Sequence, residues 1–288
     1  MRGATSPHGG EARALVLGGG GVTGIAWETG LLAGLAEAGI DLTTADLVVG
    51  TSAGSVVGAQ ILSGPTLQDL YAKQVEDATG EIAARMSPGT MLRFVLYAMW
   101  PGDDKRGRAR LGHAASKAKT VSEAERLAVI ARRLPKPDWP AGRLKITAVD
   151  AETGEARVFD RDSGVSLLDA VAASCAVPLV WPPITINGRR YIDGGVRSIA
   201  NADLAAGSDR VVVLAPVTFS IRRSSSIAGQ LASLGVNVRS VVVSPDARAR
   251  QAIGPNSLDP ARRATSARAG RAQAEAVSGA IAKLWSPA

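Results

Sequence analysis

The fold of this chain is decided by two glycine-rich stretches, ALVLGGGGVTG at residues 14–24 and DLVVGTSAG at residues 46–54. A short apolar run before turn residues is typical of a buried strand, and glycine permits the tight turn that follows it. Apolar residues then recur at helical spacing from Ile25 to Ala38, and Gly39 is a natural end for that helix. This repeated order of strand, turn and helix predicts an α/β protein with a largely parallel central sheet.

The later part of the chain continues the alternation. Further strands are predicted by the apolar stretches at 144–149, 157–159, 211–214 and 236–243. Asn187-Gly188, between two short strand-like runs, is a strong signal for a β-hairpin. Because a parallel sheet is covered by helices on both of its faces, the pattern predicts a three-layer α/β/α architecture.

We expect one large domain with an insertion. Residues 1–11 are polar and predict a disordered tail, and residues 12–288 form the domain. The block at about 66–137 changes to amphipathic and basic segments, which we interpret as a mostly helical cap insertion. A stretch rich in alanine and arginine at about 260–285 predicts a C-terminal helix.

Composition limits the partners and the compartment. The chain has 288 residues, a formal net charge of +7 and one cysteine, Cys175, within an apolar run. Positive charge suits anionic partners such as lipid head groups, whereas no recognisable motif indicates nucleic-acid binding. There is no secretory h-region and no run of about 18 apolar residues. We therefore expect a cytoplasmic protein with a buried thiol, whose membrane contact is peripheral, at the inner face.

The first glycine cluster, at residues 18–24, lies where a strand meets a helix. Its backbone N–H groups can point outward together at the positive end of the helix dipole, where a phosphate or an oxyanion binds. The spacing of Gly19, Gly21 and Gly24 also matches a dinucleotide-binding fingerprint. That fingerprint expects a carboxylate at the end of the second strand, and this chain has a serine-containing turn there. A nucleotide-binding Rossmann-type oxidoreductase is therefore the alternative function.

The second cluster, Gly50-Thr51-Ser52-Ala53-Gly54, matches the nucleophile elbow G-x-S-x-G. In such an elbow a sharp turn from strand to helix strains the serine backbone and exposes its hydroxyl. Gly50 and Gly54 avoid the clashes that larger side chains would make there. The pattern predicts Ser52 as a nucleophile, and the competing interpretation is that Ser52 only caps the following helix.

The histidines decide which group could activate this serine. His8 lies in the predicted tail, and His113 lies in the basic part of the insertion, which we assign to a surface loop. An α/β-hydrolase triad runs in the order serine, acid, histidine, and no histidine follows His113. Asp193, at a strand end and followed by Gly194-Gly195, is the candidate base; the competing interpretation is an ordinary turn aspartate.

Together the three sites resemble the patatin-like phospholipase family. Its glycine-rich oxyanion loop, its G-x-S-x-G elbow and its D-G-[GA] motif occur here in the same order, between about residues 14 and 216. The resemblance implies a patatin-like fold and a catalytic dyad of Ser52 and Asp193. It also implies an oxyanion hole at Gly19, Gly20 and Gly21.

The resemblance further implies a lipid or ester substrate, two-step acyl transfer, and no metal or organic cofactor. The chain departs from the family pattern at Thr23, where the family often has arginine or lysine, and at Gly18, which replaces a frequent acid. These changes leave the backbone donors in place and alter the charge around the loop, on which substrate preference depends. A catalytically idle lipid-binding module is a further alternative, and the sequence does not indicate the oligomeric state.

The segment at 91–100 is apolar apart from Arg93 and is too short to span a bilayer. Basic residues follow it directly at positions 105, 106, 108 and 110. Such a combination can dock on an anionic membrane surface. The competing interpretation is a buried cap helix with a solvated basic loop after it.

Overall fold

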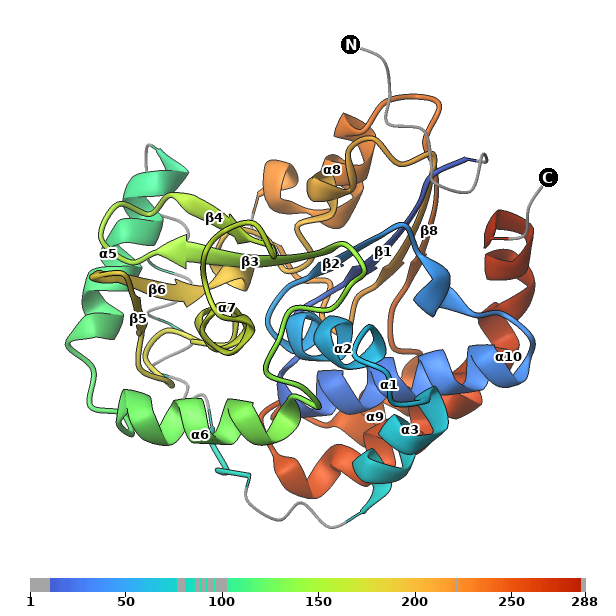
Figure 1. Ribbon diagram of the computed structural model, residues 1–288, viewed down its shortest axis with the longest axis horizontal. Helices are drawn as coiled ribbons and strands as arrows, with labels where there is room; N and C mark the ends of the chain where they lie inside the picture. The colour runs from blue at the N-terminus through green and yellow to red at the C-terminus, as the bar shows by residue number, and fades with distance from the viewer. Residues whose placement is uncertain are drawn as a thin grey trace.

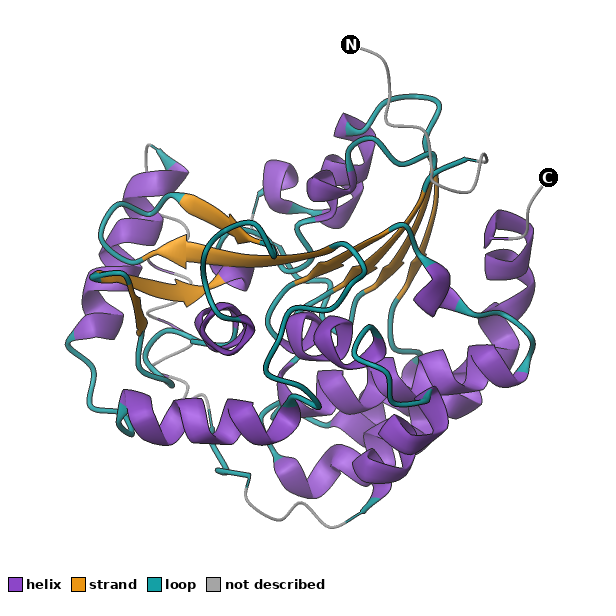
Figure 2. Ribbon diagram, in the orientation of Figure 1, coloured by secondary structure: helices purple, strands orange, loops and turns teal. Residues whose placement is uncertain are grey.

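The computed structural model describes residues 11–76, 81–85, 89, 92, 96, 103–220 and 222–285. Within these ranges the chain forms one central sheet with helices on both of its faces (Figure 1, Figure 2). The α/β class and the layered architecture expected from the sequence are therefore confirmed.

The central sheet contains eight strands in the described part of the chain. Their bounds are β1 Arg13–Leu17, β2 Leu47–Gly50, β3 Leu144–Asp150, β4 Ala156–Phe159, β5 Ile184–Ile186, β6 Arg189–Asp193, β7 Arg210–Leu214 and β8 Arg239–Val243. The order across the sheet is β5-β6-β3-β2-β1-β7-β8, and β4 also pairs with β3. The run from β3 to β8 is parallel, whereas the pairs of β3 with β4, β3 with β6 and β5 with β6 are antiparallel.

The α-helices of the described residues cover the sheet unevenly, and most of them lie on one face (Figure 1). Their bounds are α1 Gly21–Glu37, α2 Ala53–Ile61, α3 Leu67–Val75, α5 Asp104–Ser116, α6 Glu123–Arg133, α7 Leu167–Ser174, α8 Ile227–Ser233, α9 Ala247–Ile253 and α10 Arg263–Trp285. Short 3-10 turns are η1 Leu42–Thr44, η2 Gly194–Val196, η3 Ala202–Ala205, η4 Arg223–Ser225 and η5 Pro260–Arg262.

Strand β1 shows why the sheet needs cover on both faces. Its side chains alternate, so that Leu15 and Leu17 join the larger core, which includes residues of α1, α2, α7 and α10. Ala14 and Val16 point the other way, into a smaller core with residues of η3 and α8. All four side chains are fully buried, as expected for a central parallel strand.

The predicted cap insertion at 66–137 includes α3, α5 and α6, and much of the chain between α3 and α5 lies outside the described residues. The prediction of a basic surface loop around His113 is wrong, because this part of the chain forms helix α5. The helix begins just after Asp103, whose carboxylate accepts a hydrogen bond from the Lys105 backbone N–H. His113 therefore lies exposed on a helix rather than in a loop.

Glu11, the last residue of the predicted disordered tail, is instead held by ion pairs in the structure. Its carboxylate forms ion pairs with Arg210 and Arg239, at the starts of β7 and β8. Residues 1–10, which make up the rest of that predicted tail, lie outside the described residues.

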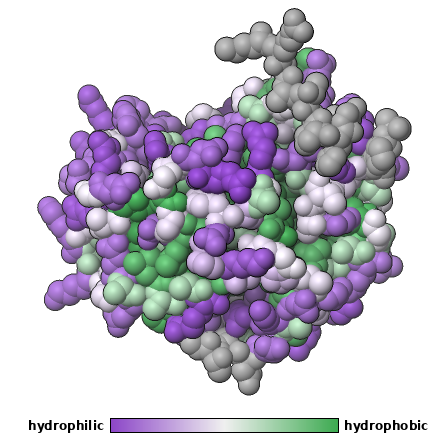
Figure 3. Space-filling view, in the orientation of Figure 1, coloured by the Kyte–Doolittle hydropathy of each residue, from purple (hydrophilic) through white to green (hydrophobic). Residues whose placement is uncertain are grey.

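The surface mixes hydrophobic and hydrophilic side chains. On the face of Figure 3, hydrophobic side chains gather above the position of α6 at the left and again right of the centre, and hydrophilic ones dominate the rim. Among the described helices, none combines the length and the apolar character that a bilayer-spanning helix requires. Most of the apolar segment at 91–100 lies outside the described residues, and of it Leu92 and Leu96 are exposed.

Candidate active site

Ser52 occupies the turn between β2 and α2 in a strained backbone conformation. Its φ of 52° and ψ of −114° are unusual for a residue with a side chain. The turn is crowded, because a Cβ on Gly54 would lie 2.1 Å from the carbonyl oxygen of Leu17 in β1. A Cβ on Gly50 would lie 2.6 Å from the carbonyl oxygen of Gly54. The two glycines therefore let the chain turn sharply enough to hold Ser52 at the strand end.

The C-terminal end of α7 supports this turn. The Ser52 N–H donates to Oγ of Ser174 over 2.9 Å, so Ser52 does not use its N–H within α2. Its carbonyl oxygen accepts from Oγ of Ser55 at 2.7 Å and from Sγ of Cys175 at 3.3 Å. Burial raises the pKa of the Cys175 thiol, in agreement with the expected core thiol. These contacts fix the Ser52 backbone, and none of them uses the Ser52 hydroxyl.

Asp193 ends β6 and faces the same interior as Ser52. Its Oδ1 accepts from the Gly195 N–H at 2.7 Å, whereas Oδ2 is buried and has no hydrogen-bond partner among the described residues. Burial raises the pKa of the Asp193 carboxyl to about 6, and the Ser52 hydroxyl, the Gly195 N–H and the charge of Arg126 oppose that rise. One carboxylate oxygen is thus held in place and the other remains open to accept a proton.

The glycine loop between β1 and α1 lies against the Ser52 turn. The Gly54 N–H donates to the carbonyl oxygen of Gly18 at 3.0 Å. The Gly19 N–H, expected as an oxyanion donor, instead donates to the carbonyl oxygen of Ile199 at 2.8 Å. Gly19 is therefore a poor donor for a ligand, because its hydrogen bond is already made.

Three other N–H groups near Ser52 are better placed as donors. Within the described ranges, no hydrogen bond engages the N–H groups of Gly20 and Gly21, which start α1. Ala53 is the first residue of α2, so its N–H has no acceptor within that helix. The positive ends of both helix dipoles favour negative charge here. The sequence indicated Gly20 and Gly21 but not Ala53.

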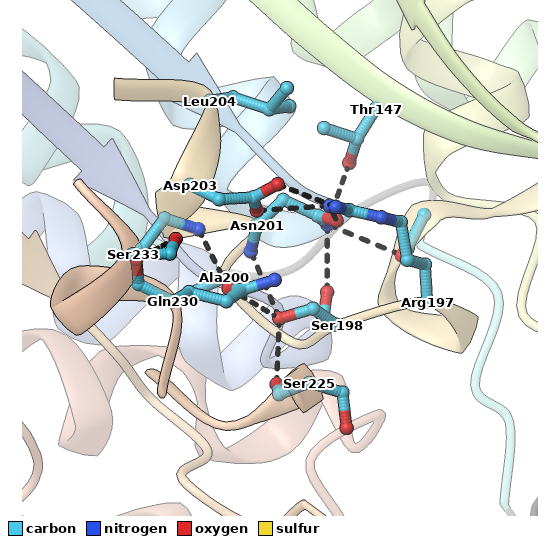
Figure 4. A network of polar contacts seen from close by, with 12 residues as sticks. Thr147, Arg197, Ser198, Ala200, Asn201, Asp203, Leu204, Ser225, Gln230 and Ser233 are labelled. Atoms are coloured by element: carbon cyan, nitrogen blue, oxygen red, sulfur yellow. Dashed lines mark hydrogen bonds and ion pairs between the residues drawn. The ribbon is translucent and has the colours of Figure 1, made fainter. Parts of the chain in front are cut away.

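Figure 4 shows a buried polar network around Asn201. Through Thr51 and Gly194 this network joins the turn that carries Ser52 to the turn after Asp193. At its centre, Nδ2 of Asn201 donates to Oγ1 of Thr51 at 3.1 Å and to the carbonyl oxygen of Gly194 at 3.3 Å. Oγ1 of Thr147, on β3, donates to Oγ1 of Thr51 at 3.0 Å. Nη1 of Arg197 donates to Oδ1 of Asn201 at 2.6 Å, which fixes the orientation of the amide. Local sequence patterns do not indicate this network, because its members come from the turn after β2, from β3 and from the segment after β6.

Ser52 also lines a small cavity of about 20 Å³, room for roughly one water molecule. Its wall is mostly apolar and includes Val177, Trp181 and Leu258. Two cationic side chains of α6, Arg126 and Arg133, complete it. An acyl ester could enter only if part of this wall moved. In the part of the chain that the structure describes, no group of His, Cys, Asp or Glu side chains resembles a metal site.

The chain is similar to known proteins in sequence and in fold. A sequence model described as patatin-like phospholipase matches residues 15–206, a range that includes Ser52 and Asp193. The crystal structure of VipD from Legionella pneumophila is similar at 14% identity and a TM-score of 0.47, covering 97% of this chain and 70% of that one. The crystal structure of the type III effector protein ExoU is similar at 17% identity and a TM-score of 0.42. That match covers 95% of this chain and 53% of the ExoU chain.

Proposed function

The chain belongs to the patatin-like phospholipase family, which makes it a lipid acyl hydrolase, and we propose that Ser52 and Asp193 carry this activity as a catalytic dyad. The observation that supports the proposal most is the pairing of a strained serine turn with a buried carboxylate that has one open oxygen. The Ser52 hydroxyl is close enough to the carboxylate to lower its pKa. Hydrogen bonds of this kind often tighten only when substrate is bound.

In the first step, Ser52 Oγ attacks the carbonyl carbon of the ester while Oδ2 of Asp193 takes the hydroxyl proton. The negative charge that develops on the carbonyl oxygen is stabilised by the N–H groups of Gly20, Gly21 and Ala53. Each such donor typically lowers the barrier by about 3–4 kcal/mol. When the tetrahedral intermediate collapses, Asp193 returns its proton to the leaving alcohol, and the acyl group stays on Ser52.

In the second step, water attacks the acyl-enzyme while Asp193 takes a proton from the water. When this tetrahedral intermediate collapses, the bond between the acyl group and Ser52 Oγ breaks, the free acid leaves, and Asp193 returns the proton to Ser52 Oγ. A base with a pKa of about 6 is ionised at neutral pH and binds a proton better than an ordinary aspartate. Burial therefore improves the basicity that a carboxylate needs for both steps. The chemistry requires no group beyond the side chains and N–H donors named here.

Labelling with a fluorophosphonate tests this proposal, with the adduct located by mass spectrometry. We expect a single adduct on Ser52, loss of hydrolysis of a short-chain ester in the labelled protein, and no adduct in Ser52→Ala. A protein that neither reacts nor hydrolyses esters but binds lipid vesicles would be the idle binding module. Saturable NAD binding without serine labelling would favour the oxidoreductase.

Peripheral contact with an anionic membrane is part of the proposal, and α5 makes the basic cluster smaller than the sequence suggested. Nζ of Lys105 forms an ion pair with Glu155 at 2.5 Å. Nε of Arg108 donates to the carbonyl oxygen of Gly154 at 2.7 Å. Glu155 offsets the charge of Lys105, whereas Arg108 keeps its charge because its acceptor is neutral. Electrostatic docking therefore depends less on Lys105 than the sequence suggested. Co-sedimentation with anionic vesicles at low and high salt would measure it.

A further inference from the structure

Arg126 is an unusual cation for the interior of this protein. It lies on α6, is 3% exposed, and lines the cavity that Ser52 also lines. Its guanidinium stacks on the Trp181 ring, 4.1 Å from the ring centroid. A buried arginine normally has a carboxylate partner, because an unpaired charge in the interior is costly.

The hydrogen bonds of Arg126 leave most of its donors unused. Nη2 has one long contact, 3.5 Å to the carbonyl oxygen of Cys175. Nε and Nη1 are buried and have no partner in the part of the chain that the structure describes. Since Nε carries one N–H and Nη1 carries two, at least three donors are available beside the cavity.

Neighbouring charges do not satisfy these donors. Arg133 lies further along α6 and lines the same cavity. Its Nε and Nη2 donate to the two carboxylate oxygens of Glu81, at 3.1 Å and 2.5 Å. Glu81 is therefore held by Arg133, and Arg126 shares no ion pair with it. Asp193 acts on Arg126 only through its charge, without a hydrogen bond. Burial lowers the pKa of the Arg126 guanidinium to about 10, which leaves it positive at neutral pH.

We propose that Arg126 binds the anionic group of a negatively charged acyl ester, such as the phosphate of a phospholipid, while Ser52 attacks the ester carbonyl. This inference rests on the proposed function and names the substrate class for the same site. The apolar wall residues would contact the acyl part, and the unused guanidinium donors would meet the anion. A charge-assisted hydrogen bond in a buried site is stronger than a neutral one, so the anionic ester would be preferred.

A matched pair of soluble substrates tests this. Dihexanoyl phosphatidic acid and dihexanoylglycerol carry the same acyl chains, and only the first has a phosphate. We expect wild type to prefer the phosphatidic acid. At pH 8, well above the Asp193 pKa of about 6, Arg126→Gln should lower kcat/KM for the phosphatidic acid at least about tenfold, mainly through KM. At that pH it should change kcat/KM for dihexanoylglycerol less than about threefold. Arg126→Lys, which keeps the charge, should retain part of the preference. Arg132→Gln, on the exposed side of α6, is the matched control and should behave like wild type.

Other results separate this inference from its premise. If wild type hydrolyses both esters through Ser52 and Arg126→Gln slows both equally, Arg126 acts on the dyad and the inference is wrong. If inorganic phosphate inhibits wild type but the phosphatidic acid is not preferred, Arg126 binds free anions rather than substrate, which also overturns it. If wild type hydrolyses neither ester, the proposed function fails. If thermal melting shows that Arg126→Gln does not fold, two results still test the inference. These are the preference of wild type for the phosphatidic acid and the part of that preference that Arg126→Lys retains.

Discussion

The side-chain amide of Asn201 donates to Oγ1 of Thr51 over 3.1 Å, a contact between the segment that follows the proposed base and the turn that carries the proposed nucleophile. Thr51 directly precedes Ser52, and Asn201 also holds the carbonyl oxygen of Gly194, directly after Asp193. Asn201 has a φ of 52°, in the left-handed region, where asparagine is better tolerated than most residues. Asn201 therefore helps to set the relative position of the dyad residues without a hydrogen bond from its amide to either of their side chains.

Asn201→Gly should reduce both stability and turnover. Glycine tolerates the left-handed backbone, so the change removes the buried amide without adding backbone strain. We expect a loss of about 1–3 kcal/mol in the free energy of unfolding, and a lower kcat with little change in KM. Asn187→Gly is the control, because Asn187 also has a positive φ but lies exposed in the β5–β6 turn. Equal kcat in Asn201→Gly and wild type would remove the proposed positioning role.

Ser52→Ala should lower ester hydrolysis by at least about 10⁴-fold, the scale expected for loss of a nucleophile. Neighbouring hydroxyls cannot replace it. Oγ1 of Thr51 donates to the carbonyl oxygen of Ala200 at 3.3 Å, and Oγ of Ser55 donates to the carbonyl oxygen of Ser52. Hydrolysis of a short-chain ester and thermal melting would be measured together. A folded variant that keeps a tenth of the wild-type rate would contradict the mechanism.

Asp193→Asn should lower kcat by about 10²–10⁴-fold, the usual contribution of a general base. Because the base must be ionised and the pKa of Asp193 is about 6, kcat/KM of the wild type should rise with pH through about 6 and level off above it. His113→Ala is the control, since Nδ1 of His113 contacts the carbonyl oxygen of Ala109 on its own helix. A pH profile that depends on His113 instead would restore a histidine-based mechanism.

Asp193→Asn should also make the folded protein more stable at alkaline pH. Burial raises the folded-state pKa of Asp193 from 3.8 to about 6, so its stabilising contribution is complete below about pH 3.8 and is lost as pH rises through about 6. At pH 8 the wild type must keep an ionised carboxylate in the interior, whereas asparagine carries no charge. We expect Asp193→Asn to melt at a higher temperature than wild type at pH 8. At pH 4 the difference should be much smaller, and a lower melting temperature at pH 8 would count against the raised pKa.

Local patterns predicted the turns of the site well, because steric rules act over a few residues. The glycines around Ser52 and the Asn187-Gly188 hairpin follow from backbone geometry alone, and both are in the structure as expected. The partners of those turns could not be predicted in this way. Ile199 takes the hydrogen bond of Gly19 from a segment far along the chain, and only the folded arrangement brings the two together.

Helix α5 shows the opposite failure, in which a local rule misleads. Glycines within residues 101–119 suggested a loop, since glycine disfavours helices. In the structure Gly112 lies where α5 crosses β3, and a Cβ there would be 2.0 Å from the carbonyl oxygen of Ala151. Glycine at position 112 therefore allows α5 to pack closely against the backbone at Ala151, and it does not mark a flexible loop. The importance of Arg126 could not be predicted from the sequence either. It is one of 33 Lys and Arg residues, and only the structure shows that it is buried.

Glu28 leads to a prediction about alkaline pH. It lies in the middle of α1, is fully buried, and neither carboxylate oxygen has a hydrogen-bond partner within the described ranges. Burial raises the pKa of Glu28 well above 4.5. The Gly18 backbone N–H offsets part of this rise, but its hydrogen bond goes to the carbonyl oxygen of Leu214. The interior around Glu28 therefore favours the neutral form of its carboxyl group.

A raised folded-state pKa means that the stability contributed by Glu28 is complete below about pH 4.5 and is lost as pH rises through the folded value. Glu28→Gln has nearly the same shape and cannot ionise, so its melting temperature should fall less than that of wild type toward alkaline pH. Glu275→Gln, at an exposed position of α10, should leave the wild-type slope unchanged. Melting curves from pH 5 to pH 10, at about one-unit steps, would show the difference. Parallel curves for wild type and Glu28→Gln would mean that Glu28 is already paired or ionised in the folded protein.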